Sequence, residues 1–142
     1  MIIAVVRIKG QVGLKKPIVE TLNRLRLRRK YACVVFAKPN KIQEGMIKKV
    51  KDFVAFGEIN KETFEKLIEA RGQLINKKKK IDVKKTIEEL EKGKKYEDVN
   101  LKPFFRLHPP RGGIDSKKHF GVQKGVLGNH KDKISKLIER ML

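Results

Sequence analysis

Two nearly continuous apolar runs, residues 2 to 8 and residues 31 to 37, constrain the fold of this chain more than any other feature. Runs of this length and hydrophobicity predict buried strands. Between them, Pro17 is suited to a first helical position, and the apolar residues after it recur at helical spacing. The start of the chain therefore predicts a strand, an amphipathic helix and a second strand.

The next segment carries a helix start and a third apolar run. Asn40 can accept a hydrogen bond from the third helical residue while Gln43 reaches back, which is the pattern of a capping box. Residues 53 to 59 then predict a third strand. This order of elements argues for an α+β core with a three-stranded sheet, both helices on one face and the other face left available. The apolar stripe of the second helix is predicted to consist of Ile42, Met46 and Val50.

The chain is predicted to have two parts, a core of residues 1–59 and an extension of residues 60–142. Residues 99–128 hold three of the five prolines and five of the eleven glycines with little periodicity, which predicts an extended, mostly irregular arm. Helix caps and apolar spacing elsewhere in the extension predict three helices. These are expected over residues of about 60–72, with Gly72 as C-terminal cap, about 82–93, with Asp82 as N-terminal cap, and about 130–142.

A formal net charge of +20, from 36 Lys and Arg against 16 Asp and Glu, implies an anionic partner, because self-repulsion on this scale destabilises a compact state. No apolar run approaches the roughly 20 residues that a membrane-spanning helix needs, so nucleic acid is favoured over a membrane. The net charge is +11 in residues 1–57, +2 in residues 58–98 and +7 in residues 99–142. The core and the arm are therefore expected to share the contact, and the middle helices to be ordinary solvated surface.

A glycine-bearing turn follows the first strand. The segment from Gly10 to Lys16 lies between a strand and a helix, where nucleotide-binding loops place their glycines. Its spacing fits neither the phosphate loop nor the dinucleotide fingerprint, which argues against a nucleotide cofactor. An exposed turn with Lys9, Lys15 and Lys16 can still bind an RNA phosphate, and a merely solvated turn is the alternative.

Five cations crowd the end of the first helix: Arg24, Arg26, Arg28, Arg29 and Lys30. A helix C-terminus favours positive charge, which accounts for one or two of them but not for five. The planar guanidinium of Arg forks onto phosphate and stacks on bases, so the local preference for Arg indicates an RNA contact. In residues 104–120, aromatic, basic, proline and glycine residues interleave, a pattern that can lie along RNA or pack as an irregular loop.

Enzymatic and metal-binding functions find little support in the sequence. Cys33 lies inside an apolar run, where a thiol is usually a small buried hydrophobe rather than a nucleophile. Ser116 and Ser135 lack the context of a nucleophile elbow, and no carboxylate cluster that would hold a divalent metal stands out. The three histidines are too scattered for a metal site. We expect no catalysis, no metal and no cofactor.

Residues 2–59 resemble the universal large-subunit ribosomal protein family that is numbered thirty in bacteria. The resemblance is carried by Val5-Val6-Arg7-Ile8 leading to Gly10, by Leu22-x-x-Leu25-x-Leu27-Arg28-Arg29 and by Gly45-Met46-Ile47-x-Lys49-Val50. The second half is similar to the longer archaeal and eukaryotic branch, numbered seven in eukaryotes, and His130 stands where that branch favours Arg. The segments that carry this similarity are Phe105-Arg106-Leu107, Pro110-Arg111-Gly112-Gly113, Phe120, Gly128-Asn129 and Ile134-x-x-Leu137-Ile138-x-x-Met141. The lack of the long basic N-terminal extension of eukaryotic members favours an archaeal source.

The resemblance implies a ferredoxin-like half with strand order three-one-two, and a structural constituent of the large ribosomal subunit in the cytoplasm. It implies that the protein binds large-subunit ribosomal RNA near the 5S RNA, contacts neighbouring ribosomal proteins, and has no membrane or small-molecule partner. A free RNA-binding regulator or RNA chaperone is the alternative. The candidate RNA-binding residues are Arg7, Lys9, Gly13, Lys15, Lys16, Arg24, Arg28, Arg29, Lys30, Lys38, Lys41, Lys48, Lys49, Arg106, His108, Arg111, Gly112, Gly113, Lys117, Lys118, His119, Lys124 and Asn129.

Overall fold

The structure is a computed structural model that describes residues 2–10, 13–37, 39–78, 80, 82–109, 116–119, 125–129 and 133–142; for residues 97, 116–119, 125, 126 and 129 it describes the backbone alone. Strand β1 (Ile2–Arg7) runs through the centre of the sheet, antiparallel to β2 (Ala32–Phe36) on one side and to β3 (Val54–Ile59) on the other. The predicted three-stranded core and its strand order are confirmed.

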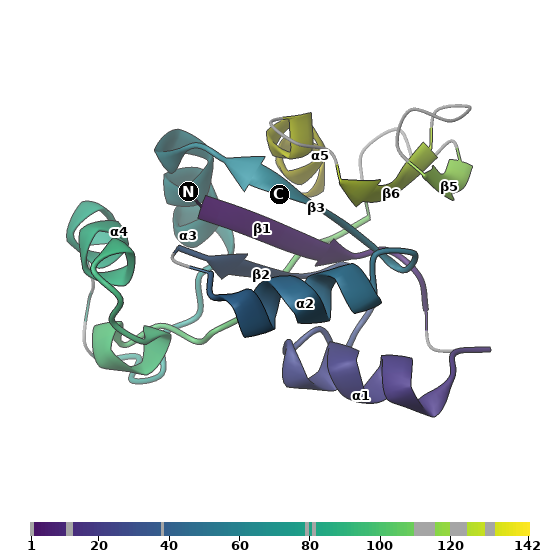
Figure 1. Cartoon of the computed structure of the whole chain (residues 1–142). Coiled ribbons are helices and arrows are strands. Elements are labelled where there is room, and N and C mark those ends of the chain that lie inside the picture. The colour runs from purple at the N-terminus through teal and green to yellow at the C-terminus, as the bar shows by residue number, and fades with distance from the viewer. Residues whose placement is uncertain are drawn as a thin grey trace.

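Helices α1 (Lys16–Arg24) and α2 (Lys41–Lys49) cover one face of these strands, as predicted (Figure 1). Leu22 of α1 and Ile47 of α2 are buried with Val5 of β1 in one apolar cluster. The prediction that Ile42 is buried is wrong, because its side chain is 75% exposed. Ile42 lies in the first turn of α2, about 140° around the helix from Ile47, and Ile47 takes the inward position.

The opposite face of the sheet is also covered. Helix α3 (Lys61–Arg71), helix α4 (Val83–Glu91) and helix α5 (Ile134–Met141) supply buried residues to a second cluster with Ala4 and Val6 of β1. Figure 1 shows α3 and α5 on the far side of the sheet from α1 and α2. The expectation that this face stays available is therefore wrong. The signal lies in β1 itself, because a strand with apolar residues on both sides is buried on both faces.

Three strands from the second half extend the sheet. Strand β4 (Phe105–Arg106) pairs with β2, and β6 (Gly125–Asn129) pairs with β3 and with β5 (Ser116–His119). The result is a six-stranded sheet in the order β4-β2-β1-β3-β6-β5. The prediction that residues 99–128 form a mostly irregular arm is thus wrong for these strands, and the short 3-10 helix η1 (Tyr96–Val99) leads into this segment. Strand β4 has only two residues, and β5 (SKKH) and β6 (GVLGN) carry neither a long apolar run nor a strict alternation of apolar and polar residues, so no sequence pattern marks them as strands.

Side-chain caps begin α2, α3 and α4, and the sequence predicts those of α2 and α4. The Asn40 side chain accepts from the Gln43 N–H at 2.8 Å, and the Gln43 side chain accepts from the Asn40 N–H at 3.1 Å. Asn60 caps α3 and Asp82 caps α4 in the same way, each through one backbone N–H. Gly72 follows α3 as expected, and a Cβ there would lie 2.4 Å from the Ile68 carbonyl oxygen, so a larger residue would force the backbone to shift.

Candidate nucleic-acid interface

Three cations lie over aromatic rings at the end of the sheet where β1 ends and β2 and β3 begin. We call them the ring-supported cations: Lys9 over Phe53 at 5.4 Å, Lys30 over Tyr31 at 5.2 Å and Arg106 over Phe104 at 5.5 Å from the ring centre. All three rings are half-buried. A cation within about 6 Å of a ring centre is attracted by the quadrupole of the ring. This attraction orients the three positive charges without neutralising them.

Backbone hydrogen bonds bring these distant segments together. The Tyr31 N–H donates to the Arg7 carbonyl oxygen at 2.7 Å, and the Leu107 N–H donates to the Tyr31 carbonyl oxygen at 3.1 Å. On the other side of β1, the Lys9 N–H donates to the Phe53 carbonyl oxygen at 3.2 Å. One end of a rigid sheet therefore carries all three ring-supported cations, although they are spread over about a hundred residues of sequence.

Arg7 points into the protein. Its side chain is 2% exposed, its Nη1 donates to the Leu27 carbonyl oxygen at 2.8 Å, and its Nε donates to the Lys9 carbonyl oxygen at 3.0 Å. Burial lowers the pKa of this guanidinium from its usual value. An RNA contact by Arg7 stays a prediction. Because its side chain is buried and bonded to the backbone, its role in the structure is to stabilise the fold, and the proposed interface does not include it.

The turn before α1 places two exposed lysines at the start of that helix. Gly13 has a φ of +80°, a left-handed conformation that favours glycine. Lys15 is the N-cap of α1 and Lys16 is its first residue, and the Lys15 side chain makes no capping hydrogen bond. The N-terminal end of a helix carries partial positive charge, so two lysines there are unfavourable until an anion binds. This arrangement suits a phosphate.

The end of α1 exposes Arg24, Arg28, Arg29 and Lys30 together. Arg26, which lies among them and was not among the candidate residues, adopts a φ of +65°. Its N–H donates to the Asn23 carbonyl oxygen at 3.0 Å, and the Leu27 N–H donates to the Leu22 carbonyl oxygen at 2.9 Å. These two bonds form a Schellman motif in which Arg26 holds the position that usually belongs to glycine.

The lysines of α2 are exposed at both ends of the helix. Lys48 and Lys49 lie in the last turn, where their charge also favours the helix dipole. Lys41 is the first residue of α2, where the dipole opposes its charge. The helix dipole is therefore enough to account for the positions of Lys48 and Lys49, with or without an RNA contact. It does not account for the position of Lys41.

The candidate residues of the second half are only partly described. His108 is half-buried, with Nδ1 2.8 Å from the Pro109 carbonyl oxygen and Nε2 in hydrogen-bond contact with the Leu142 carbonyl oxygen, so the chain itself occupies its ring. Strands β5 and β6 hold Lys117, Lys118, His119 and Asn129, of which the backbone alone is described. The candidates that lie outside the described residues are Lys38, Arg111, Gly112, Gly113 and Lys124.

Cys33 is fully buried, as predicted, and burial raises the pKa of its thiol, so the reactive thiolate is disfavoured. Within the described residues, no group of three or more His, Cys, Asp or Glu side chains gathers in a way that would hold a metal. None of the helices in that part of the chain combines the length and hydrophobicity needed to cross a bilayer.

Together, the mixed sheet, its ring-supported cations and the basic turns define a small, strongly basic α+β protein with exposed charge around one sheet end. Comparison with known families gives the particular class. Residues 3–54 match the family described as ribosomal protein L30p/L7e.

Full-length relatives support the same family. The chain is 42% identical to a large ribosomal subunit protein uL30 of Methanococcus vannielii, with both chains covered completely. It is 44% identical to the uL30 protein of Archaeoglobus fulgidus over 97% of this chain and 98% of that one. A uL30 protein of Desulfurococcus amylolyticus is 42% identical over 98% of this chain. The chain belongs to the ribosomal protein L30p/L7e family, and the resemblance drawn from the sequence motifs is confirmed.

Proposed function

We propose that this chain is a non-enzymatic constituent of the large ribosomal subunit that binds large-subunit ribosomal RNA and stabilises its fold. The observation that carries the proposal is the set of ring-supported cations, fixed on one rigid sheet end beside the exposed arginines of α1. The relatives that bear the name of a large-subunit protein support the ribosomal location. The proposed partners are ribosomal RNA, in the neighbourhood of the 5S RNA, and adjacent ribosomal proteins of the cytoplasmic ribosome.

The proposed mechanism is electrostatic and positional. The sheet end, the turn at Lys15 and Lys16, and the arginines at Arg28 and Arg29 come from separate elements, so one protein can neutralise several RNA segments at once. Phosphate contacts fix the position of a protein on RNA without reading sequence. Because the charges sit on a folded scaffold, the RNA segments that they bind are held in one mutual geometry.

Charge reversal tests the proposal. We expect the double variant R28E/R29E to weaken binding to protein-free large-subunit ribosomal RNA and to flatten the salt dependence of the binding constant. The matched control is K84E/K85E, which reverses two adjacent exposed cations on α4, in the segment of low net charge. The proposal fails if R28E/R29E binds like the wild type, or if both double variants weaken binding equally.

Cosedimentation separates the ribosomal role from a free RNA chaperone. We expect the chain to remain with large subunits through a gradient in high salt, because its proposed contacts with several RNA segments must all break before it dissociates. Recovery in the free fraction alone, together with exchangeable binding to unrelated RNAs, would support the chaperone instead.

A further inference from the structure

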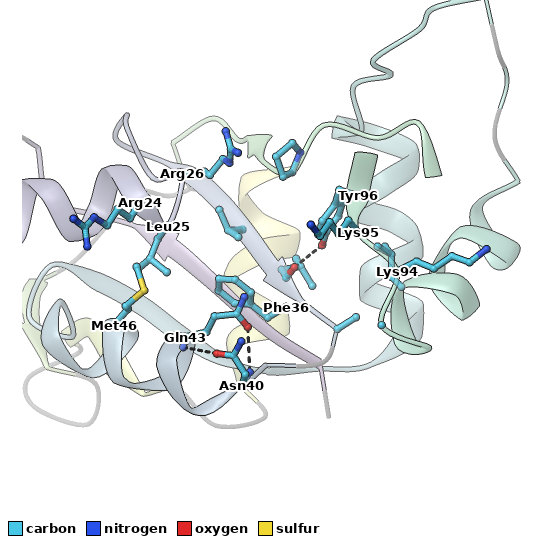
Figure 2. Close-up of a pocket in the computed structure, with 16 residues that line it drawn as sticks. Arg24, Leu25, Arg26, Phe36, Asn40, Gln43, Met46, Lys94, Lys95 and Tyr96 are labelled. Carbon is cyan, nitrogen blue, oxygen red and sulfur yellow. Dashed lines mark hydrogen bonds between the residues drawn. The ribbon is translucent and has the colours of Figure 1, made fainter. Parts of the chain in front are cut away.

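A groove lies beside the part of β2 that does not pair with β4, and its lining residues differ from the ring-supported cations. Its volume is about 530 Å³, and it lies between the end of α1, the start of α2 and the segment after α4 (Figure 2). This volume is within the range of roughly 300–1,000 Å³ that is typical of ligand sites. Strand β4 pairs only with Ala32 and Cys33, so the rest of β2 faces this groove.

Four cations line the groove, and they come from two parts of the chain. Arg24 and Arg26 lie at the end of α1, and Lys94 and Lys95 follow α4. All four are exposed, and none of the described residues that line the groove is acidic. Lys94 forms an ion pair with Glu89 at 3.6 Å, and both side chains are exposed to solvent. The groove therefore attracts an anion.

The interior of the groove is apolar and includes an aromatic ring. Phe36 of β2 is half-buried and lies in the middle of the view in Figure 2, with Leu25 and Met46 on the side of α1 and α2. An anionic group with a flat apolar part fits this combination, and an unpaired nucleotide has both. Unpaired bases stack on aromatic side chains and on Arg guanidinium planes, while their phosphates bind cations.

The backbone of Arg26 gives independent support. A non-glycine residue in the left-handed conformation costs about 1–2 kcal/mol, and a Schellman motif normally avoids this cost by using glycine. Retaining Arg26 there places a guanidinium at the rim of the groove. Tyr31 and Asn100 share this conformation, but among the three Arg26 alone lines the groove, which makes a use of its side chain a hypothesis to test.

A peptide strand fits less well. The Tyr96 hydroxyl donates to the Val35 carbonyl oxygen, so this edge of β2 is already bonded where an added strand would need it free. We propose that the groove receives one unpaired nucleotide of ribosomal RNA, with its base against Phe36 and its phosphate near Arg26 and Lys95. This inference rests on the proposed function and adds the residues and the kind of RNA element that they bind.

The variant R26G tests the proposal with opposite effects on folding and binding. Glycine suits the left-handed conformation, so the urea midpoint of R26G should equal or exceed that of the wild type. Its affinity for protein-free large-subunit ribosomal RNA should fall roughly five-fold or more, as expected for the loss of one stacked or charge-assisted contact. R26K, which keeps the charge but not the planar fork, should recover only part of the affinity. The control K85Q removes one exposed charge from α4 outside the groove and should change affinity less than two-fold.

Photocrosslinking identifies the occupant in the assembled particle. With benzoylphenylalanine in place of Phe36, we expect large subunits to give an adduct with RNA after irradiation. An adduct with a protein alone, or no adduct, overturns the proposal. So does R26G binding as tightly as the wild type. If the wild-type chain fails to bind ribosomal RNA at all, the proposed function falls as well, whereas wild-type binding with an unaffected R26G removes only the groove assignment.

Discussion

The guanidinium of Arg7 donates a 2.8 Å hydrogen bond to the carbonyl oxygen of Leu27, which joins the end of β1 to the segment that follows α1. The second bond of Arg7, to the Lys9 carbonyl oxygen, fixes the start of the turn that carries Lys15 and Lys16. A buried cation satisfied by two carbonyl oxygens thus supports two of the basic segments that surround it.

We expect R7M to lower the free energy of unfolding by roughly 3 kcal/mol, because two carbonyl oxygens lose a charged donor inside the protein. R7K keeps the charge, but a single ammonium group replaces the fork, so its loss should be smaller. Urea denaturation measures both values. A loss below about 0.5 kcal/mol for R7M, typical of surface substitutions, would contradict a structural role for Arg7.

Removal of the ring-supported cations should change the salt dependence of RNA binding. We expect the double variant K9Q/R106Q to reduce the slope of log K against log salt by about 0.7–0.9 for each phosphate contact that is lost. Titrations of protein-free large-subunit ribosomal RNA at several salt concentrations measure the slope. K84Q/K85Q is the matched control and should leave it nearly unchanged. An unaltered slope in K9Q/R106Q would show that the sheet end does not contact phosphate.

Alkaline pH should destabilise the fold through Cys33 and Tyr96. Burial raises the pKa of both groups, and the nearby Cys33 raises that of Tyr96 further. Both groups are neutral when protonated, so the folded state keeps protons that the unfolded state loses above about pH 8.5 for Cys and about pH 10 for Tyr. Stability is therefore fully present below these values and falls as pH rises, by about 1.4 kcal/mol per pH unit for each group. Urea midpoints from pH 7 to 11 measure the fall.

The variant C33A isolates the contribution of the thiol. We expect it to be less stable than the wild type at pH 7 but to lose less stability between pH 8.5 and 10. Equal losses in both proteins over that range would mean that the thiol does not titrate differently in the folded and unfolded states.

The boundary predicted between residues 59 and 60 stays a proposal, and truncation tests its energetic meaning. A chain that ends at residue 59 would expose Ala4, Val6 and Ala55, which α3 and α5 cover in the full chain. We expect this fragment to aggregate or to lack a cooperative urea transition, because an apolar sheet face needs a packed layer. A soluble fragment with a cooperative transition would show that residues 1–59 fold alone.

Local signals in the sequence were enough for the order of the first seven helices and strands. Apolar runs marked β1, β2 and β3. Asn40 and Asp82 marked the starts of α2 and α4, and each is the N-cap of its helix. The pattern of charge also indicated Lys9, Lys30 and Arg106, which the fold places at one sheet end. These features depend on residues that are close together in the sequence, so the sequence alone is enough to predict them.

Tertiary structure decided which of these residues face inward and which segments become neighbours. Nothing near Arg7 in the sequence shows that the Leu27 carbonyl oxygen accepts from it, and the spacing of Ile42 does not show that Ile47 takes the inward position. Lys94 and Lys95 line the same groove as Arg26 only because the segment after α4 lies beside β2 in the fold. Local backbone preference, net charge and family membership follow from the residues and their order along the chain. Burial and strand pairing required the folded chain, because they depend on residues far apart in sequence that the core brings together.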